Sequence, residues 1–148
     1  MSKLQHSQKL NFKIRTHGII LGTERFEACV AFYRDILELP VWYEKPGLVC
    51  LRFGDGYLMV EAGGVARDRR KSQSENPTML RFNVDDVEAA ADALRRRGIP
   101  VEVETYSWGT VGTFLDPDGN VCEFKNADDP FFKLDRSQSM SGGHHVQS

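Results

Sequence analysis

Residues 113–124 read TFLDPDGNVCEF, a stretch that predicts two strands joined by a tight turn. The run Asp116-Pro117-Asp118-Gly119 fits a type I turn, with Asp at the first position, Pro at the second and Gly at the last. Side chains alternate across a strand, so Val121 and Glu123 share one face of the outgoing strand. The stretch therefore fixes the place of one carboxylate, Glu123, which is either a functional group or a solvent-side residue of an edge strand.

Composition limits the possible classes of protein. The chain has 148 residues, of which 41% are hydrophobic and 27% charged, which predicts one globular domain or two small similar halves. A net charge of −2 gives no electrostatic case for a nucleic-acid partner. No apolar run reaches the roughly 20 residues of a membrane span, and the polar start lacks the apolar stretch of a secretory signal. We therefore expect a cytoplasmic protein with no membrane partner.

Three cysteines are present, Cys29, Cys50 and Cys122. Their number is odd and no C-x-x-C spacing occurs, so we expect reduced cysteines that act as small hydrophobes.

The first half of the chain predicts one module over residues 13–64, after a polar N-terminal tail over residues 1–12. A strand is expected over 13–21. Apolar residues then recur at helical spacing over 24–37, with Thr23 as the N-cap. Three short strands follow, over 40–43, 48–53 and 57–61, separated by Pro-Gly and Gly-Asp-Gly turns.

Residues 65–76, VARDRRKSQSEN, are polar and show no apolar period. We interpret them as a linker. Its basic residues leave two readings open, a solvated loop or an anion-binding arm for an acidic substrate.

The second half, residues 77–126, repeats the same order of elements before a C-terminal tail over 127–148, where we expect disorder. A strand over 78–84 and a helix over 86–97 precede strands over 99–104, 109–115 and 120–125. Superimposing the helices pairs Tyr33 with Leu94, 61 positions apart, and the last strands pair Glu61 with Glu123, 62 positions apart. Such self-similarity predicts a repeated architecture.

The segments EACVAFYRDILELPV, FNVDDVEAAADALRRRGIPV and FLDPDGNVCEF resemble the vicinal oxygen chelate superfamily, which includes glyoxalases, bleomycin-resistance proteins and extradiol dioxygenases. The resemblance covers residues 13–126. It implies an α+β fold of two βαβββ modules in tandem, forming a curved mixed sheet around a cavity, and a homodimer.

In metal-using relatives, the ligands come from the first and last strands of each module. Carried over to this chain, the positions are His17, Glu61, Met79 and Glu123. His17, Glu61 and Glu123 would then bind a divalent ion such as Zn, Ni, Mn or Fe, with Glu123 and Glu61 as the catalytic carboxylates.

Met79 departs from the family pattern, because a thioether is a poor ligand for a hard divalent metal. The register of the first strand is also open by one residue. Pairing the helices sets Gly18, rather than His17, opposite Met79, and His17 would then point toward the helices. The resemblance thus leaves a metal site and a metal-free cavity both open.

Residues near the strand ends are the expected substrate contacts. Trp108 precedes the strand that leads into the DPDGN turn, and Tyr57 begins the last strand of the first half. Arg81 is a candidate for holding a substrate carboxylate or phosphate. Together with Met79, these residues form the predicted substrate-binding set.

The resemblance implies two main functions. One is a glyoxalase-like, metal-dependent lyase or isomerase that acts on a small molecule with vicinal oxygens through an enediolate. The other is a metal-free protein that binds a small molecule or an antibiotic. An extradiol dioxygenase needs two histidines at its iron, and the histidines at 6, 17, 144 and 145 place only one in the predicted core.

Overall fold

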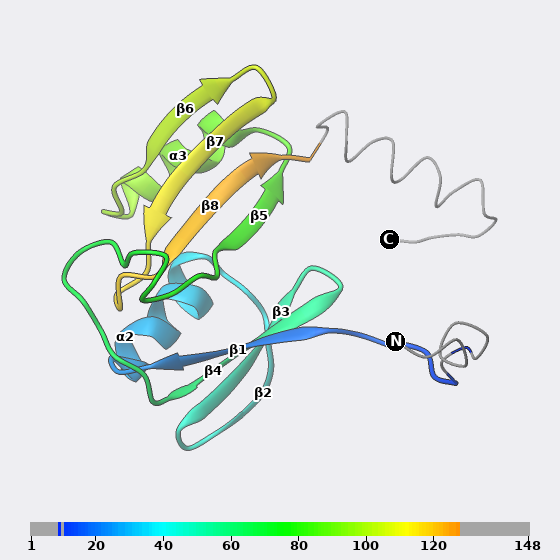
Figure 1. Cartoon of the computed structure of the whole chain (residues 1–148). Helices are drawn as coiled ribbons and strands as arrows, with labels where there is room; N and C mark the ends of the chain where they lie inside the picture. The colour runs from blue at the N-terminus through cyan, green and yellow to red at the C-terminus, as the bar shows by residue number, and fades with distance from the viewer. Residues whose placement is uncertain (1–8, 10, 128–148) are drawn as a thin grey trace.

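The structure is a computed structural model that describes residue 9 and residues 11–127. The chain forms two modules with the same order of elements (Figure 1). Predictions for residues 1–8, 10 and 128–148, which make up most of both tails, lie outside the described residues. The first module contains β1 (Gly18–Thr23), α2 (Phe26–Val30), η1 (Ala31–Ile36), β2 (Val41–Lys45), β3 (Leu48–Phe53) and β4 (Gly56–Ala62). The second contains β5 (Leu80–Val84), α3 (Val87–Arg96), β6 (Glu102–Tyr106), β7 (Gly109–Leu115) and β8 (Val121–Asn126).

Each module has one four-stranded mixed sheet. The strand order is β1-β4-β3-β2 in the first and β5-β8-β7-β6 in the second. In both sheets the first and last strands of the module pair in parallel, and the other neighbours are antiparallel. The predicted α+β fold of two tandem βαβββ modules is confirmed.

The DPDGN turn is confirmed and ties the two modules together. The backbone N–H of Gly119 donates to the carbonyl of Asp116 at 2.9 Å, which closes the predicted turn. The buried Asp116 carboxylate accepts the N–H groups of Asp118 and Asn120, both at 2.9 Å. It also accepts the hydroxyl of Tyr33, from the first module, at 2.7 Å.

The start of the first helix differs from the prediction. Thr23 does not cap it, because its hydroxyl donates to the carbonyl of Glu61 at 3.0 Å. The N–H groups of Glu24 and Arg25 instead donate to the carboxylate of Asp118, at 2.8 and 3.0 Å. A helix N-terminus leaves free N–H groups that need acceptors, and here the acceptor comes from the other module.

The second helix is capped from its own sequence. The Asp86 carboxylate accepts the N–H of Ala89 at 3.0 Å, which is the bonding expected of an N-cap aspartate. Gly98 follows the helix with φ of 86°, a left-handed conformation that suits glycine.

Each sheet has one face covered by helix and one face that we call helix-free. In the first sheet, Leu51, Leu58 and Val60 lie on the covered face and join one hydrophobic core with residues of α2 and η1. In the second sheet, Phe114, Cys122 and Phe124 pack on the same core beside α3, which lies behind β6 and β7 (Figure 1). Alternation then places Tyr57, Met59, Glu61, Arg81 and Glu123 on the helix-free faces.

The three cysteines are free and buried. Among the described residues, no helix combines the length and apolar character needed to cross a bilayer. β1 begins at Gly18, whereas the sequence predicted a strand from residue 13.

Candidate functional site

Glu123 lies on the helix-free face of the second sheet, at its centre. Its strand, β8, is flanked by β5 and β7, and only 6% of the residue is exposed. Arg81, its direct neighbour on β5, donates through Nε to the carboxylate and forms an ion pair with it. The alternative that Glu123 is a solvent-side residue of an edge strand is therefore wrong, and the buried charge has a guanidinium partner, as buried charges require.

An aromatic surface lies at the β6–β7 end of the second sheet. The rings of Tyr106 and Trp108 stack with centroids 4.8 Å apart and planes 4° apart. The ammonium of Lys125, two residues beyond Glu123 on β8, lies 5.4 Å from the centre of the Trp108 ring. The Tyr106 hydroxyl donates to the Glu104 carboxylate, and this bond raises the pKa of the tyrosine.

The first sheet carries its own aromatic group. Trp42 and Tyr57 have ring centroids 5.5 Å apart, and the Arg52 guanidinium lies 4.3 Å from the centre of the Trp42 ring. Tyr57, Arg52 and Gly18 are neighbours across the three strands β4, β3 and β1. The predicted contact residues Tyr57 and Trp108 thus belong to two separate aromatic groups, one in each module.

The hydrogen bonds that end each module reveal how the two modules correspond. Gly63 donates to the carbonyl of Thr23 at 2.8 Å, and Ala127 donates to the carbonyl of Val84 at 2.8 Å. Val84 follows Thr23 by 61 positions, but Ala127 follows Gly63 by 64. The last strands therefore correspond with an offset of 64, and the predicted offset of 62 is wrong.

This correction changes the partner of each glutamate. Ile20 corresponds to Arg81, and their parallel partners are Met59 and Glu123, respectively. Met59, not Glu61, therefore occupies the place equivalent to Glu123. Glu61 corresponds to Lys125, one position beyond on the same face.

His17 lies away from the helix-free face. Gly18 pairs with Tyr57, which lies on the helix-free face, so Gly18 is the position of β1 that belongs to that face. The imidazole Nε2 of His17 lies 2.6 Å from the point where a Cβ on Gly56 would stand. Gly56 shares the strand face of Leu58, which is covered by helix. His17 and Glu61 are thus on opposite faces of one sheet.

The donor set does not fit a divalent metal ion within one chain. Among the residues that the structure describes, no group of three or more His, Cys, Asp or Glu side chains is placed to hold one. Two of the four predicted positions, His17 and Glu61, do not converge, because they lie on opposite faces of the first sheet. The cause is strand register, because one residue's difference moves His17 to the other face.

Met79 precedes β5 and is 42% exposed. It lines a pocket of about 270 Å³ together with Val121 and linker residues that include Arg70 and Lys71. The thioether and the valine side chain provide apolar contact surface rather than metal ligands.

The thiols are poor candidates for chemistry. Burial raises the pKa of Cys29 and of Cys122, and the nearby Asp116 carboxylate raises both further. Neither cysteine is a thiolate at neutral pH, which is the reactive form.

Sequence reasoning did not assign Lys125 to the site, and it considered Tyr106 only as one of several aromatic residues near strand ends. Lys125 could have been found from its spacing, since residues 121, 123 and 125 of one strand share a face. The stacking of Tyr106 on Trp108 depends on the two-residue connection between β6 and β7, where Tyr106 pairs with Gly109.

Comparisons with known proteins agree with the fold. The uncharacterized protein YraH of Bacillus subtilis (strain 168) is 27% identical over 111 residues, which cover 66% of this chain and 87% of YraH. Lactoylglutathione lyase from Agrobacterium tumefaciens has a similar structure, with a TM-score of 0.61, 22% identity, and coverage of 75% of this chain and 92% of that one. TnmS3, an antibiotic binding protein from Streptomyces sp. CB03234, has a TM-score of 0.57, 21% identity, and coverage of 80% and 98%.

At these identities the two solved structures establish the shared fold alone. The family assignment comes from a sequence model that matches residues 15–124, most of the chain. On that match, the protein belongs to the glyoxalase/bleomycin resistance protein/dioxygenase superfamily.

Proposed function

We propose that the protein binds a small planar organic molecule on the helix-free face of the second sheet, without the help of a metal ion. The observation that carries this proposal is the ion pair between Arg81 and the buried Glu123. A guanidinium already compensates the charge that a bound cation would otherwise compensate. The positions that correspond to Met79 and Glu123 in the first module are Gly18 and Met59, which offer no hard ligand.

The aromatic surface supports a planar ligand. Tyr106 and Trp108 are 44% and 52% exposed and stack on each other, so the pair offers accessible aromatic surface to a planar partner. The antibiotic binding protein TnmS3 has the same fold, which supports binding as one use of this architecture.

A homodimer is part of the proposal. Ile20 and Trp42 are 61% and 47% exposed on the helix-free face of the first sheet. Large exposed apolar side chains on this face favour a second copy that closes the cavity. The cytoplasmic location expected from the sequence stays a prediction.

The competing function is a glyoxalase-like, metal-dependent lyase or isomerase. The buried Glu123 carboxylate favours it, because a carboxylate in a largely dry site is a suitable proton acceptor. Glu61 would be its second carboxylate, although the register places Glu61 opposite Gly22 rather than in the place of Glu123.

Metal analysis and dye binding separate the two functions. Acridine orange, a planar aromatic dye, is titrated into the purified protein with and without excess EDTA and followed by its own fluorescence. We expect EDTA to leave the affinity unchanged. We expect Trp108→Ala to weaken binding by about three- to tenfold, the range for one aromatic contact.

Three variants complete the experiment. Glu123→Gln and Met79→His should leave the divalent metal content of the purified protein unchanged, as should Glu88→Gln, which makes the same chemical change on the exposed surface of α3. Stoichiometric metal that Glu123→Gln removes, together with loss of dye binding in EDTA, would overturn the proposal in favour of the lyase.

A further inference from the structure

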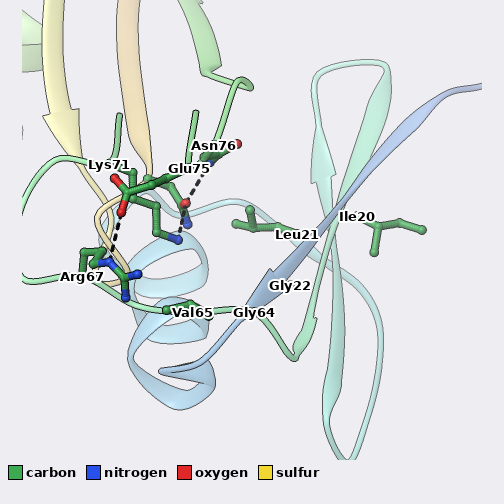
Figure 2. Close-up of a pocket in the computed structure, with 10 residues that line it drawn as sticks. Ile20, Leu21, Gly22, Gly64, Val65, Arg67, Lys71, Glu75 and Asn76 are labelled. Carbon is green, nitrogen blue, oxygen red and sulfur yellow. Dashed lines mark hydrogen bonds and ion pairs between the residues drawn. The ribbon is translucent and has the colours of Figure 1, made fainter. Parts of the chain in front are cut away.

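A pocket of about 510 Å³ lies between β1 and the linker (Figure 2), and neither Arg81 nor Glu123 lines it. Leu21 and Val65 form its apolar wall, and the side chains of Arg67, Lys71 and Glu75 form its polar wall. Figure 2 shows Leu21 pointing from β1 toward this polar wall.

The acidic residue of the pocket is fully compensated. Glu75 accepts from Arg67 Nε at 3.0 Å and Arg69 Nη1 at 2.8 Å, and from the backbone N–H of Ser72 at 2.8 Å. The bond from Arg69, followed by that from Ser72, holds the pKa of Glu75 well below its usual range. Glu75 therefore stays ionised and is occupied by two arginines.

Lys71 is different, because its partner is neutral. Its ammonium donates to the side-chain carbonyl of Asn120 at 2.9 Å. Among the described residues, no carboxylate lies within ion-pair distance of Lys71. An ammonium has three N–H donors, so the pocket offers an uncompensated positive charge with donors to spare.

The polar wall is held in place before any ligand binds. The backbone N–H groups of Arg67 and Lys71 donate to the carbonyls of Asp118 and Gly119, at 2.9 and 3.0 Å. The side chain of Asn76 donates to the same Asn120 oxygen as Lys71, at 2.8 Å. A preorganised wall lowers the entropy cost of binding.

We propose that this pocket binds a small organic anion, with a carboxylate on Lys71 and an apolar chain against Leu21 and Val65. A compact ammonium binds carboxylates as a point charge, and the apolar wall favours an aliphatic chain over a purely inorganic anion. Lys71 also lines the pocket of about 270 Å³ beside Met79, but the pocket of about 510 Å³ contains none of Arg81, Glu123 and Trp108, so this proposal does not depend on the dye-binding proposal.

Isothermal titration of the full-length protein with hexanoate tests the proposal, with hexylamine as the cationic analogue of equal chain length. Hexanoate should bind and hexylamine should not. Lys71→Met should weaken hexanoate binding about tenfold or more, since hydrogen bonds to charged groups are strong. Lys71→Arg keeps the charge and should retain binding.

A matched control is Lys45→Met, which removes the same charge from the end of β2 and lines no part of this pocket. Its affinity for hexanoate should equal that of the wild type. The Asn76 amide makes its own bond to Asn120, so Lys71→Met should keep the fold, and circular dichroism of this variant checks it.

Equal binding of hexylamine, or unchanged hexanoate binding in Lys71→Met, overturns the proposal. Inorganic phosphate that competes as well as hexanoate overturns the assigned ligand class, because the apolar wall would then play no part. Trp108→Ala should leave the affinity for hexanoate unchanged. A failure of the hexanoate proposal can therefore be distinguished from a failure of the planar-ligand proposal.

Discussion

At the scale of single residues, Gly119 joins the DPDGN turn to the linker. Its φ is 89°, and a Cβ at this position would lie 2.3 Å from the carbonyl oxygen of Arg69. Glycine is therefore required twice, once for the left-handed backbone and once because the linker backbone passes directly over it.

Gly119→Ala should be strongly destabilising. Gly98→Ala is the matched control, because Gly98 has φ of 86° and nothing lies within 4 Å of the point where its Cβ would stand. The control should lose about 1–2 kcal/mol of unfolding free energy, the cost of the left-handed conformation. Gly119→Ala should lose roughly 3 kcal/mol or more, because backbone must also move.

Urea denaturation of both variants measures the difference in their free energies of unfolding. The dependence of that free energy on urea concentration should be the same in both variants. Equal losses of unfolding free energy in Gly119→Ala and Gly98→Ala would show that the linker backbone does not contact Gly119 in solution.

The position of Glu123 could be predicted at this scale, because alternation within one strand depends only on sequence. Its ion pair with Arg81 could not, since it depends on how β5 aligns with β8. The placements of His17 and Glu61 failed for the same reason. Glutamate at both positions suggested an offset of 62, but loops of different length between helix and last strand give 64.

At the scale of elements, the linker over residues 65–76 is an ordered segment that is bonded to both modules. Arg25 pairs with Asp68 at 2.6 Å, and the N–H of Ala66 donates to the Glu24 carboxylate at 2.7 Å. The absence of an apolar period correctly predicted that this segment is neither helix nor strand. Its order could not be predicted, because the contacts reach residues far away in the chain.

The contribution of the linker to the stability of the protein should depend on pH. Glu75 has an ordinary pKa of 4.5, and its arginine and N–H partners lower that value in the folded state. A carboxyl whose folded pKa is lowered stabilises the protein at pH values above its ordinary pKa, and this contribution disappears as the pH falls through the folded value.

We therefore expect Glu75→Gln to be less stable than the wild type at neutral pH. The difference should shrink as the pH falls below 4.5. Urea denaturation at a series of pH values measures it, with Glu102→Gln on the exposed end of β6 as a control that should show little difference throughout. A difference in unfolding free energy between Glu75→Gln and the wild type that increases as the pH falls would contradict the assigned role of Glu75.

At the scale of the whole molecule, the two modules share one hydrophobic core. The rings of Phe53 and Phe82, from different modules, have centroids 5.0 Å apart, and those of Phe32 and Phe114 are 6.1 Å apart. Arg97 also pairs with Glu38 across the boundary at 2.7 Å. The repeat predicted two similar modules, but these contacts make them one packed unit.

Unfolding should accordingly be a single transition. The chain has two tryptophans, Trp42 in the first module and Trp108 in the second. Trp42→Phe and Trp108→Phe each leave one fluorescent reporter, and both reporters should give the same response to Leu94→Ala. That substitution in the buried face of α3 should cost about 2–5 kcal/mol.

Coincident shifts in the midpoint of urea denaturation, seen from both modules, would support a common core. A shift reported by Trp108 alone would mean that the modules unfold independently.

The Asp118 carboxylate, which accepts the N–H groups just before α2, has a consequence for any exchange of the two halves of the chain. A hybrid whose second half lacks this carboxylate would leave the N–H groups of Glu24 and Arg25, the two residues before α2, without this acceptor. The turn and the helix start can therefore be replaced only together, or with another acceptor in the place of Asp118.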